Sequence, residues 1–218
     1  ILAGISYNHE KYLDFGLELL KKIITTSFDT EYFPKSRNIR QLIFYLKYFI
    51  ILREFLKESS NGIPEYLDEI IFHLGKGYNF VWGSVKQSLL FNGNHNSNLE
   101  DFDVYLDYQK YSFKSEKRDL GGYGILKNKN VILGMDIGTA PESKFSENYQ
   151  SGPLSFEAIY RGTKIICNSG YYQNIKNKLN LISRSTAAHS TLILNNNSIV
   201  TFQKNFKGKI LNNLNFNT

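Results

Sequence analysis

The sequence is poor in the residues that cross-link a chain or carry it through a membrane. Among its 218 residues there is one cysteine, Cys167, which excludes an internal disulfide. The apolar neighbours of this cysteine predict a buried thiol. No apolar run approaches the ~18 residues that a membrane-spanning helix needs. The sequence also has no phosphate-binding loop, no HExxH motif and no CxxC pair. Within these residues, the absences exclude a membrane-spanning helix, a disulfide-stapled domain and a P-loop nucleotide-binding site.

A starting methionine and a signal-peptide pattern are absent as well, since the chain begins with Ile1. We interpret the sequence as an internal fragment of a longer protein, so the missing signal says nothing about export. No pattern in the sequence predicts an oligomeric state.

Positive charge gathers in the second half of the chain. Residues 1–112 hold 12 Lys and Arg against 14 Asp and Glu, whereas residues 113–218 hold 14 against 6. Such a basic half suits a polyanionic partner, either an acidic polysaccharide or a nucleic acid. Because the lysines are scattered and no paired aromatics mark an RNA-binding sheet, we expect no nucleic-acid partner. A simpler explanation is that the lysines keep a sheet soluble and its edges unpaired.

The spacing of apolar residues predicts helices in the first half and strands in the second. Helical spacing extends over 10–27, 38–58, the segment after Pro64 and 99–111. At Ser112 the period changes from about 3.6 to about 2, which indicates a domain boundary. Six strands are expected, at 122–127, 130–138, 153–161, 163–168, 187–195 and 198–211. The turns at 127–130 and 160–163 predict two hairpins, and short antiparallel strands of this kind favour a sandwich.

The stretch Arg184–Leu194 stands out because a small, polar segment leads into His189 and an alternating run follows it. The alternation predicts that His189 lies at the start of a strand. Taken alone, such a histidine is more simply a strand-end residue that hydrogen-bonds a neighbouring loop. Two earlier stretches favour a functional interpretation: Leu154–Glu157 (Leu-Ser-Phe-Glu) and Asn168–Gly170 (Asn-Ser-Gly).

In this order and spacing, the three stretches resemble the C-terminal sheet domain of the heparinase II/III-like family of polysaccharide lyases. The resemblance implies an α+β multidomain fold, with residues 1–112 as the C-terminal helices of an α/α toroid. Residues 113–218 would then be the N-terminal part of an antiparallel β-sandwich domain. It also implies a lyase that degrades an acidic, uronate-containing polysaccharide by β-elimination, located in the periplasm or cell envelope. That reaction needs a base, a group that neutralises the uronate carboxylate and an acid for the leaving oxygen.

The resemblance places the catalytic positions at His189, Gln150 and Arg37. His189 matches the last histidine of the family pattern, and Gln150 stands where another histidine is expected. Arg37 lies in a loop that looks like a family loop before a long helix. A tyrosine is expected a few residues into that helix, where this chain has Gln41, with Tyr45 one turn further on.

Substrate-binding positions are predicted at Asn148, Arg40, Arg184, Tyr123 and Tyr171. Arginine suits carboxylates because of its bidentate fork, and tyrosine rings stack on sugars. Two simpler interpretations stay open. The arginines cap loops or pair with carboxylates of the protein itself, and the tyrosines pack in the core.

Some relatives carry zinc in the sheet domain, and this sequence argues against it. Gln150 and Asn168 stand at ligand positions, and two amides beside the single His189 make a poor zinc site. We therefore expect no cofactor and no metal. Because amides do not titrate in the useful range, an alternative function stays open. The protein would be a catalytically impaired relative that binds an anionic glycan or serves in cell-envelope assembly.

Overall fold

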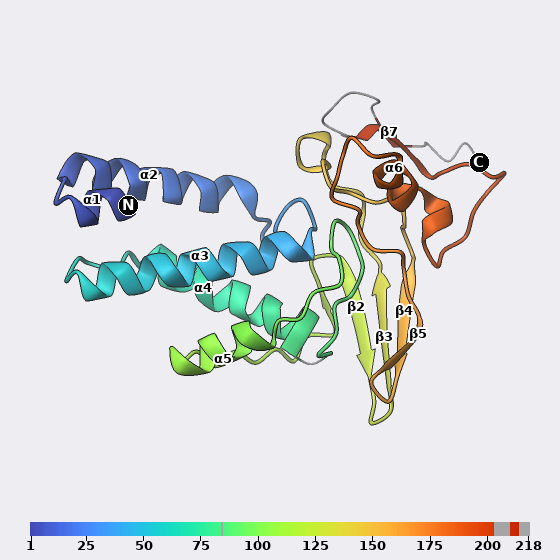
Figure 1. Cartoon of the computed structure of the whole chain (residues 1–218), viewed down its shortest axis with the longest axis horizontal. Helices are drawn as coiled ribbons and strands as arrows, with labels where there is room; N and C mark the ends of the chain where they lie inside the picture. The colour runs from blue at the N-terminus through green and yellow to red at the C-terminus, as the bar shows by residue number, and fades with distance from the viewer. Residues whose placement is uncertain (84, 203–209, 214–218) are drawn as a thin grey trace.

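The protein is a stack of helices whose ends meet a β-sheet (Figure 1). The structure is a computed structural model and describes residues 1–83, 85–202 and 210–213. Its helical elements are α1 (Leu2–Ser6), α2 (Glu10–Ser27), α3 (Ile39–Glu58), α4 (Glu65–Tyr78), the π-helical turn η1 (Asn79–Gly83), α5 (Glu100–Tyr108), η2 (Ser143–Phe145), α6 (Lys178–Arg184) and η3 (Thr186–Ala188). Its strands are β1 (Asp119–Leu120), β2 (Tyr123–Lys127), β3 (Val131–Asp136), β4 (Phe156–Tyr160), β5 (Thr163–Ile166), β6 (Val200–Phe202) and β7 (Ile210–Asn213).

The four predicted helices are confirmed as α2, α3, α4 and α5. Helices α3, α4 and α5 bury the stripes that their apolar spacing predicts, whereas α2 buries Leu20 and leaves Leu13, Leu17 and Ile24 partly exposed. Helix α3 begins where the Asn38 side chain accepts hydrogen bonds from the backbone N–H groups of Arg40 (2.9 Å) and Gln41 (3.3 Å). This is an N-cap, which satisfies donors that the first turn leaves free. The stripes of α3 and α4 are fully buried at Leu42, Leu46, Ile50, Leu56, Leu67, Ile70 and Leu74. Among the described residues, no helix is long and apolar enough to cross a membrane.

One apolar core runs from the helices into the sheet. Helical residues share it with Tyr123 and Ile125 of β2 and with Ile159 of β4. The loop after η1 adds Leu89 and Phe91, which lie against Gly134 of β3. Burial of each large apolar side chain is worth about 1.5–3 kcal/mol, so this shared core fixes the sheet to the helix ends. The division of the chain at residue 112 stays a prediction.

The main sheet is an antiparallel meander in the order β1-β2-β3-β4-β5. Both predicted hairpins are confirmed. In the first turn, the Asn128 side chain accepts from the backbone N–H groups of Asn130 (2.9 Å) and Val131 (2.8 Å). In the second turn, Arg161 and Gly162 both have positive φ, 47° and 80°, as the tight turns of two-residue hairpins require.

Several expectations are corrected by the structure. Residues 187–195 contain no strand, and α6, which the sequence did not reveal, precedes them. In place of the expected strand 198–211 there are two strands, β6 and β7, which pair with each other. Strand β7 extends to Asn213, and residues 203–209 lie outside the described residues. Cys167 is exposed, because β5 ends at Ile166 and the thiol does not enter the core. The α+β class and the antiparallel sheet are confirmed, whereas closure of a toroid and of a complete sandwich stay predictions.

Candidate functional site

The three motif stretches meet in one hydrogen-bonded network beside β4. The Asn168 backbone N–H donates to the Glu157 carboxylate (2.9 Å), and the Ser190 N–H donates to the Asn168 side-chain oxygen (3.0 Å). The Phe156 N–H in turn donates to the Ser190 hydroxyl (3.2 Å). Glu157 is fully buried and pairs with Lys164 of β5 (2.8 Å). The motifs therefore hold one corner of the sheet domain together. The Glu157 carboxylate is fully engaged by Lys164 and the Asn168 backbone.

His189 follows the 3-10 turn η3 and lies outside any strand. The backbone N–H of His189 donates to the Thr186 carbonyl (3.1 Å), and the Thr191 hydroxyl donates to the Pro153 carbonyl (2.6 Å). Leu192 and Leu194 are both exposed. The alternating sequence therefore buries no apolar face. Its polar groups form hydrogen bonds with loops, whereas those of a strand would pair with a neighbouring strand.

The imidazole of His189 is half-buried and packs against Gly152. A Cβ at Gly152 would lie 2.8 Å from the His189 ring, so glycine there leaves room for it. Burial lowers the pKa of His189 to about 4, although the Ser183 backbone opposes that shift. Its Nε2 is buried and has no hydrogen-bond partner in the part of the chain that the structure describes. The ring is neutral at ordinary pH, and its catalytic role stays a prediction.

Gln150 is a buried connector between three segments. Its Oε1 accepts from the Gly93 N–H (3.0 Å), and its Nε2 donates to the carbonyls of Gly170 (3.0 Å) and Ser183 (2.7 Å). Both ends of the amide are therefore used by backbone groups. This donor set does not fit zinc, which needs lone pairs from His, Cys or carboxylates. No group of three such side chains suited to a metal occurs among the described residues, and the expected absence of metal stays a prediction.

Arg37 joins the helical part to the sheet. Its guanidinium pairs with Asp136 at the end of β3 and donates to the carbonyls of Gly121 (3.2 Å), Gly122 (2.8 Å) and Thr139 (2.9 Å). A Cβ at Gly122 would lie 2.7 Å from the guanidinium nitrogens, which explains the glycines at this point of the sequence. With its donors engaged in this way, the geometry favours a structural role for Arg37.

The tyrosines and the other buried arginine also face the interior. Tyr123 is fully buried, donates to the Arg37 carbonyl and accepts from the Asn92 side chain (2.7 Å). Tyr171 is 5% exposed. Arg184 is fully buried, donates to the carbonyls of Tyr149 (2.7 Å) and Ser146 (3.2 Å), and lies 3.9 Å from the Phe202 ring centroid. Burial lowers its pKa to about 10. These placements favour packing roles, and the binding roles stay predictions.

A solvent-accessible hollow of about 200 Å³, which we call the junction cleft, lies between the helices and the sheet domain. Gln41 and Tyr45 enter it from α3, and Asn148 and Lys144 enter it from the segment around η2. Ser36 donates to the Gln41 side-chain oxygen and so fixes the amide. The cleft therefore brings together Gln41, Tyr45 and Asn148, which the sequence analysis named from the family resemblance.

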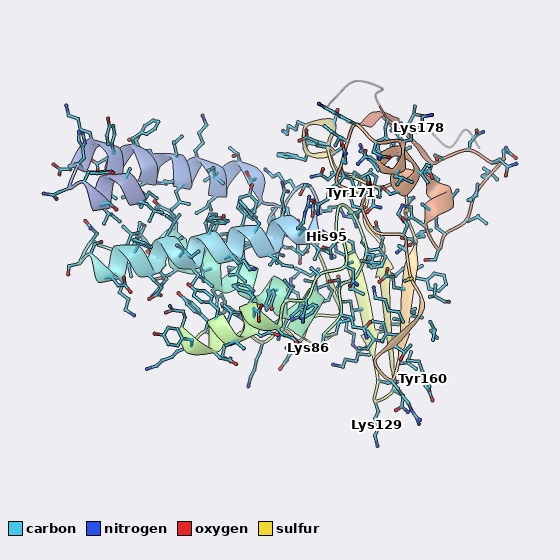
Figure 2. All side chains as sticks on the ribbon, in the orientation of Figure 1. Lys86, His95, Lys129, Tyr160, Tyr171 and Lys178 are labelled. Carbon is cyan, nitrogen blue, oxygen red and sulfur yellow. The ribbon has the colours of Figure 1, made fainter. Side chains whose placement is uncertain are left out.

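His95 and Arg40 lie beside this junction and form a pair that the sequence analysis did not find. His95 follows the Asn92-Gly93 turn, and a Cβ at Gly93 would lie 2.4 Å from the Asn38 side chain and 2.9 Å from that of Asn148. Figure 2 shows His95 between the start of α3 and the sheet domain. Burial and the positive charge of Arg40 lower the pKa of His95. His95 lies in an asparagine-rich loop, where no apolar periodicity indicates the position of a side chain. The preceding Asn92-Gly93 turn was the feature of the sequence that could have drawn attention to it.

A second solvent-accessible feature, which we call the basic groove, is lined by the segment that precedes β1 and by parts of β2 and β3. It consists of two adjoining hollows of about 550 and 560 Å³ that share Ser115 and Lys117. Its charged lining residues are Lys76, Lys114, Lys117, Arg118 and Lys127, with Glu31 and Glu116. Positive charge therefore exceeds negative charge along it.

Comparison with known proteins supports the resemblance. The model of the family "Heparinase II/III-like, C-terminal" matches residues 113–212. No curated protein sequence matches this chain. Among solved structures, heparinase III is 15% identical with a TM-score of 0.72 and covers 88% of this chain and 36% of its own. The heparan sulfate lyase HepC from Pedobacter heparinus is 13% identical with a TM-score of 0.70, covering 93% of this chain and 38% of its own.

These structural similarities, at such low identity, show the fold alone. The chain spans about a third of the length of the solved structures it resembles. The sequence match covers the segment that contains all three motif stretches and the main sheet. Residues 113–212 of this chain belong to the heparinase II/III-like C-terminal domain family.

Proposed function

We propose that the protein is a polysaccharide lyase that cleaves an acidic, uronate-containing polysaccharide by β-elimination. The observation that carries this proposal is the junction cleft, where Gln41, Tyr45 and Asn148 converge from the helical part and the sheet domain. These are the positions, or lie one turn from the positions, at which the family resemblance implies reacting groups. The family match over the sheet domain and the similarity to heparinase folds support the same proposal.

The cleft offers some of the groups that the elimination needs. Tyr45 supplies a hydroxyl that can protonate the leaving glycosidic oxygen. Gln41 and Asn148 supply amides that hydrogen-bond sugar hydroxyls. Lys144 and Glu147 line the cleft with charges of opposite sign, and Lys144 is paired with Glu142 (2.9 Å). The hollow is smaller than the ~300–1,000 Å³ of typical ligand pockets. We therefore infer that it holds a single sugar residue while neighbouring sugars lie along the surface.

The test is to incubate the full-length protein with a panel of uronate polysaccharides and to follow the ultraviolet absorbance of the unsaturated product. The panel contains heparan sulfate, because structural neighbours carry that substrate in their names. Tyr45→Phe removes the hydroxyl and keeps the ring, and Tyr48→Phe, on an exposed part of the same helix, is the control. Absorbance that rises with the wild type and the control and falls at least about 100-fold in Tyr45→Phe supports the proposal. Absence of product from every substrate contradicts it.

A second candidate function is binding of an anionic glycan without cleavage, in glycan capture or cell-envelope assembly. The observation in its favour is that Gln41, Asn148 and Gln150 are amides, which do not titrate in the useful range. Glycan binding that persists without any unsaturated product would support this function. We also propose a location in the periplasm or cell envelope, which cell fractionation tests.

A further inference from the structure

The loop Asn92–His95 is held rigidly between the two parts of the molecule. The Asn92 side chain donates to Asp136 (2.9 Å), the Gly93 N–H donates to Gln150 (3.0 Å), and the Asn94 carbonyl accepts from the Tyr171 N–H (2.8 Å). Three consecutive residues are thus bound to three different segments of the sheet domain. A loop anchored in this way presents the next side chain, His95, in a defined place.

His95 differs from the other three histidines in its surroundings. His189 is also half-buried, but its Nε2 is shielded from solvent. His73 stacks on Tyr32 with ring centroids 4.1 Å apart, and His9 lies at the exposed N-terminus of α2. His95 is half-buried at the junction, where the Gln173 amide approaches its ring nitrogens at 3.3 and 3.4 Å. Among the four histidines, His95 is the one that follows an anchored loop whose Gly93 lies beside Asn38 and beside Asn148, a lining residue of the junction cleft.

Arg40 supplies the complementary group. It lies in the first turn of α3, where its backbone N–H is bound by the Asn38 cap. Among the described residues, its guanidinium has no carboxylate within ion-pair distance, in contrast to Arg37 and Arg53. Arg40 is also the charged group whose field acts on His95. A guanidinium without an internal partner favours a carboxylate from outside, which it holds bidentately.

We propose that Arg40 and His95 form a uronate-binding site. In this site, Arg40 pairs with the carboxylate of the sugar, and His95 takes the proton from the sugar carbon to which that carboxylate is attached. The inference rests on the proposed function and supplies the base that Gln150 and His189, with its Nε2 buried, do not. The neutral imidazole that burial and Arg40 favour is the form a base needs. A carboxylate on Arg40 would cancel the charge that opposes protonation of the ring.

The elimination balances without a further reactant. The carbon–hydrogen bond next to the carboxylate breaks, and its proton passes to the unprotonated nitrogen of His95. The electron pair forms a double bond to the adjacent carbon as the bond to the glycosidic oxygen breaks. That oxygen takes the proton of the Tyr45 hydroxyl, and the phenolate regains a proton from the His95 imidazolium through solvent.

The first experiment measures unsaturated product formed from heparan sulfate by the full-length protein. His95→Gln keeps the side chain polar and removes the base, so we expect kcat to fall at least about 100-fold while oligosaccharide affinity stays within about 3-fold. We expect Arg40→Gln to raise KM as well. His9→Gln, which removes an imidazole far from the junction, is expected to retain wild-type rates. Wild-type activity in His95→Gln would overturn the proposal.

The second experiment separates this site from lyase activity as such. The pKa of His95 is measured by NMR in the full-length protein with and without glucuronate, in the wild type and in Arg40→Gln. A rise in the His95 pKa with glucuronate in the wild type, absent in the variant, supports the site even if no substrate yields product. No rise, or an equal rise in both proteins, overturns it.

Discussion

Arg37 ties the loop between α2 and α3 to the sheet. Its ion pair with Asp136 is buried on both sides, with side-chain exposures of 10% and 1%. Removing one member of such a pair leaves the other charge without compensation, which costs about 3–5 kcal/mol. We therefore expect Arg37→Ala to lower the free energy of unfolding of the chain by that amount in urea titrations.

The control for this prediction is Arg118→Ala, which removes an exposed arginine and should change the free energy of unfolding by no more than about 0.5 kcal/mol. If Arg37→Ala were as mild as the control, the ion pair would contribute little, and a substrate role for Arg37 would become the better explanation. The present geometry favours the structural role because the guanidinium donors face protein carbonyls.

His189 makes the stability of the chain depend on pH. Its pKa is about 4 in the folded protein against an ordinary 6.5, with burial as the main cause. Between these values the unfolded chain binds the proton more readily than the folded one, so stability is complete above pH 6.5 and is lost as pH falls toward 4. The loss amounts to at most about 3 kcal/mol.

The measurement is urea unfolding at several pH values for the wild type, His189→Gln and His9→Gln. Glutamine does not titrate, so the slope between pH 4 and 6.5 should flatten in His189→Gln relative to the wild type. His9 is exposed at the start of α2, and its replacement should leave the slope unchanged. Equal slopes in all three proteins would show that the His189 imidazole is open to water.

At the scale of elements, the sequence was a good guide wherever a periodic pattern and a local stop signal coincided. The apolar stripe and the Asn38 cap identify α3, and the Arg161-Gly162 pair identifies the turn between β4 and β5. Residues 187–195 show the limit. Their alternation imitates a strand, yet Leu192 and Leu194 are exposed and no core covers them. Tertiary contacts decide such short segments, and alternation alone does not.

For the candidate site, the sequence predicted which segments come together but not which side chains are buried. The three motifs do converge, through Asn168 and Ser190. These contacts favour a structural role, and the catalytic role of His189 stays a prediction. Gln150, Arg37 and Tyr123 are buried, and a single sequence does not show which side chains are buried. His95 was not predicted as a site residue, because its surroundings are set by residues distant in the sequence, Gln173 and Arg40.

The turn of the β4–β5 hairpin permits a clean test of backbone conformation. Gly162 has φ of 80°, and a Cβ there would meet nothing within 4 Å. Gly162→Ala should therefore cost about 1 kcal/mol through left-handed backbone strain alone. The matched control is Gly62→Ala, where a Cβ also meets nothing within 4 Å and φ is not in the left-handed region. It should be neutral or stabilising by about 0.4–1 kcal/mol, as thermal or urea unfolding will show. Equal effects at both positions would contradict the turn geometry.

At the scale of the whole molecule, part of the excess positive charge lies along a solvent-accessible groove. The excess belongs to residues 113–218, and this basic groove is a separate hollow from the junction cleft. Both features border the same loop, since Glu31 lines the groove and Ser36 lines the cleft. A long polyanion bound in the cleft could therefore extend toward the groove, and its affinity would depend on ionic strength.

We predict that Lys114→Glu combined with Arg118→Glu weakens binding of heparan sulfate at least about 10-fold and reduces its dependence on salt. Both residues are exposed lining residues of the groove. Lys11→Glu with Lys22→Glu on the exposed side of α2 changes the net charge equally and serves as the control. Calorimetric titrations at two salt concentrations compare the two double variants. If both lose affinity equally, net charge alone governs binding. A specific loss in the groove variant, with turnover of a short oligosaccharide retained, would mean that the groove holds the chain while the junction carries the chemistry.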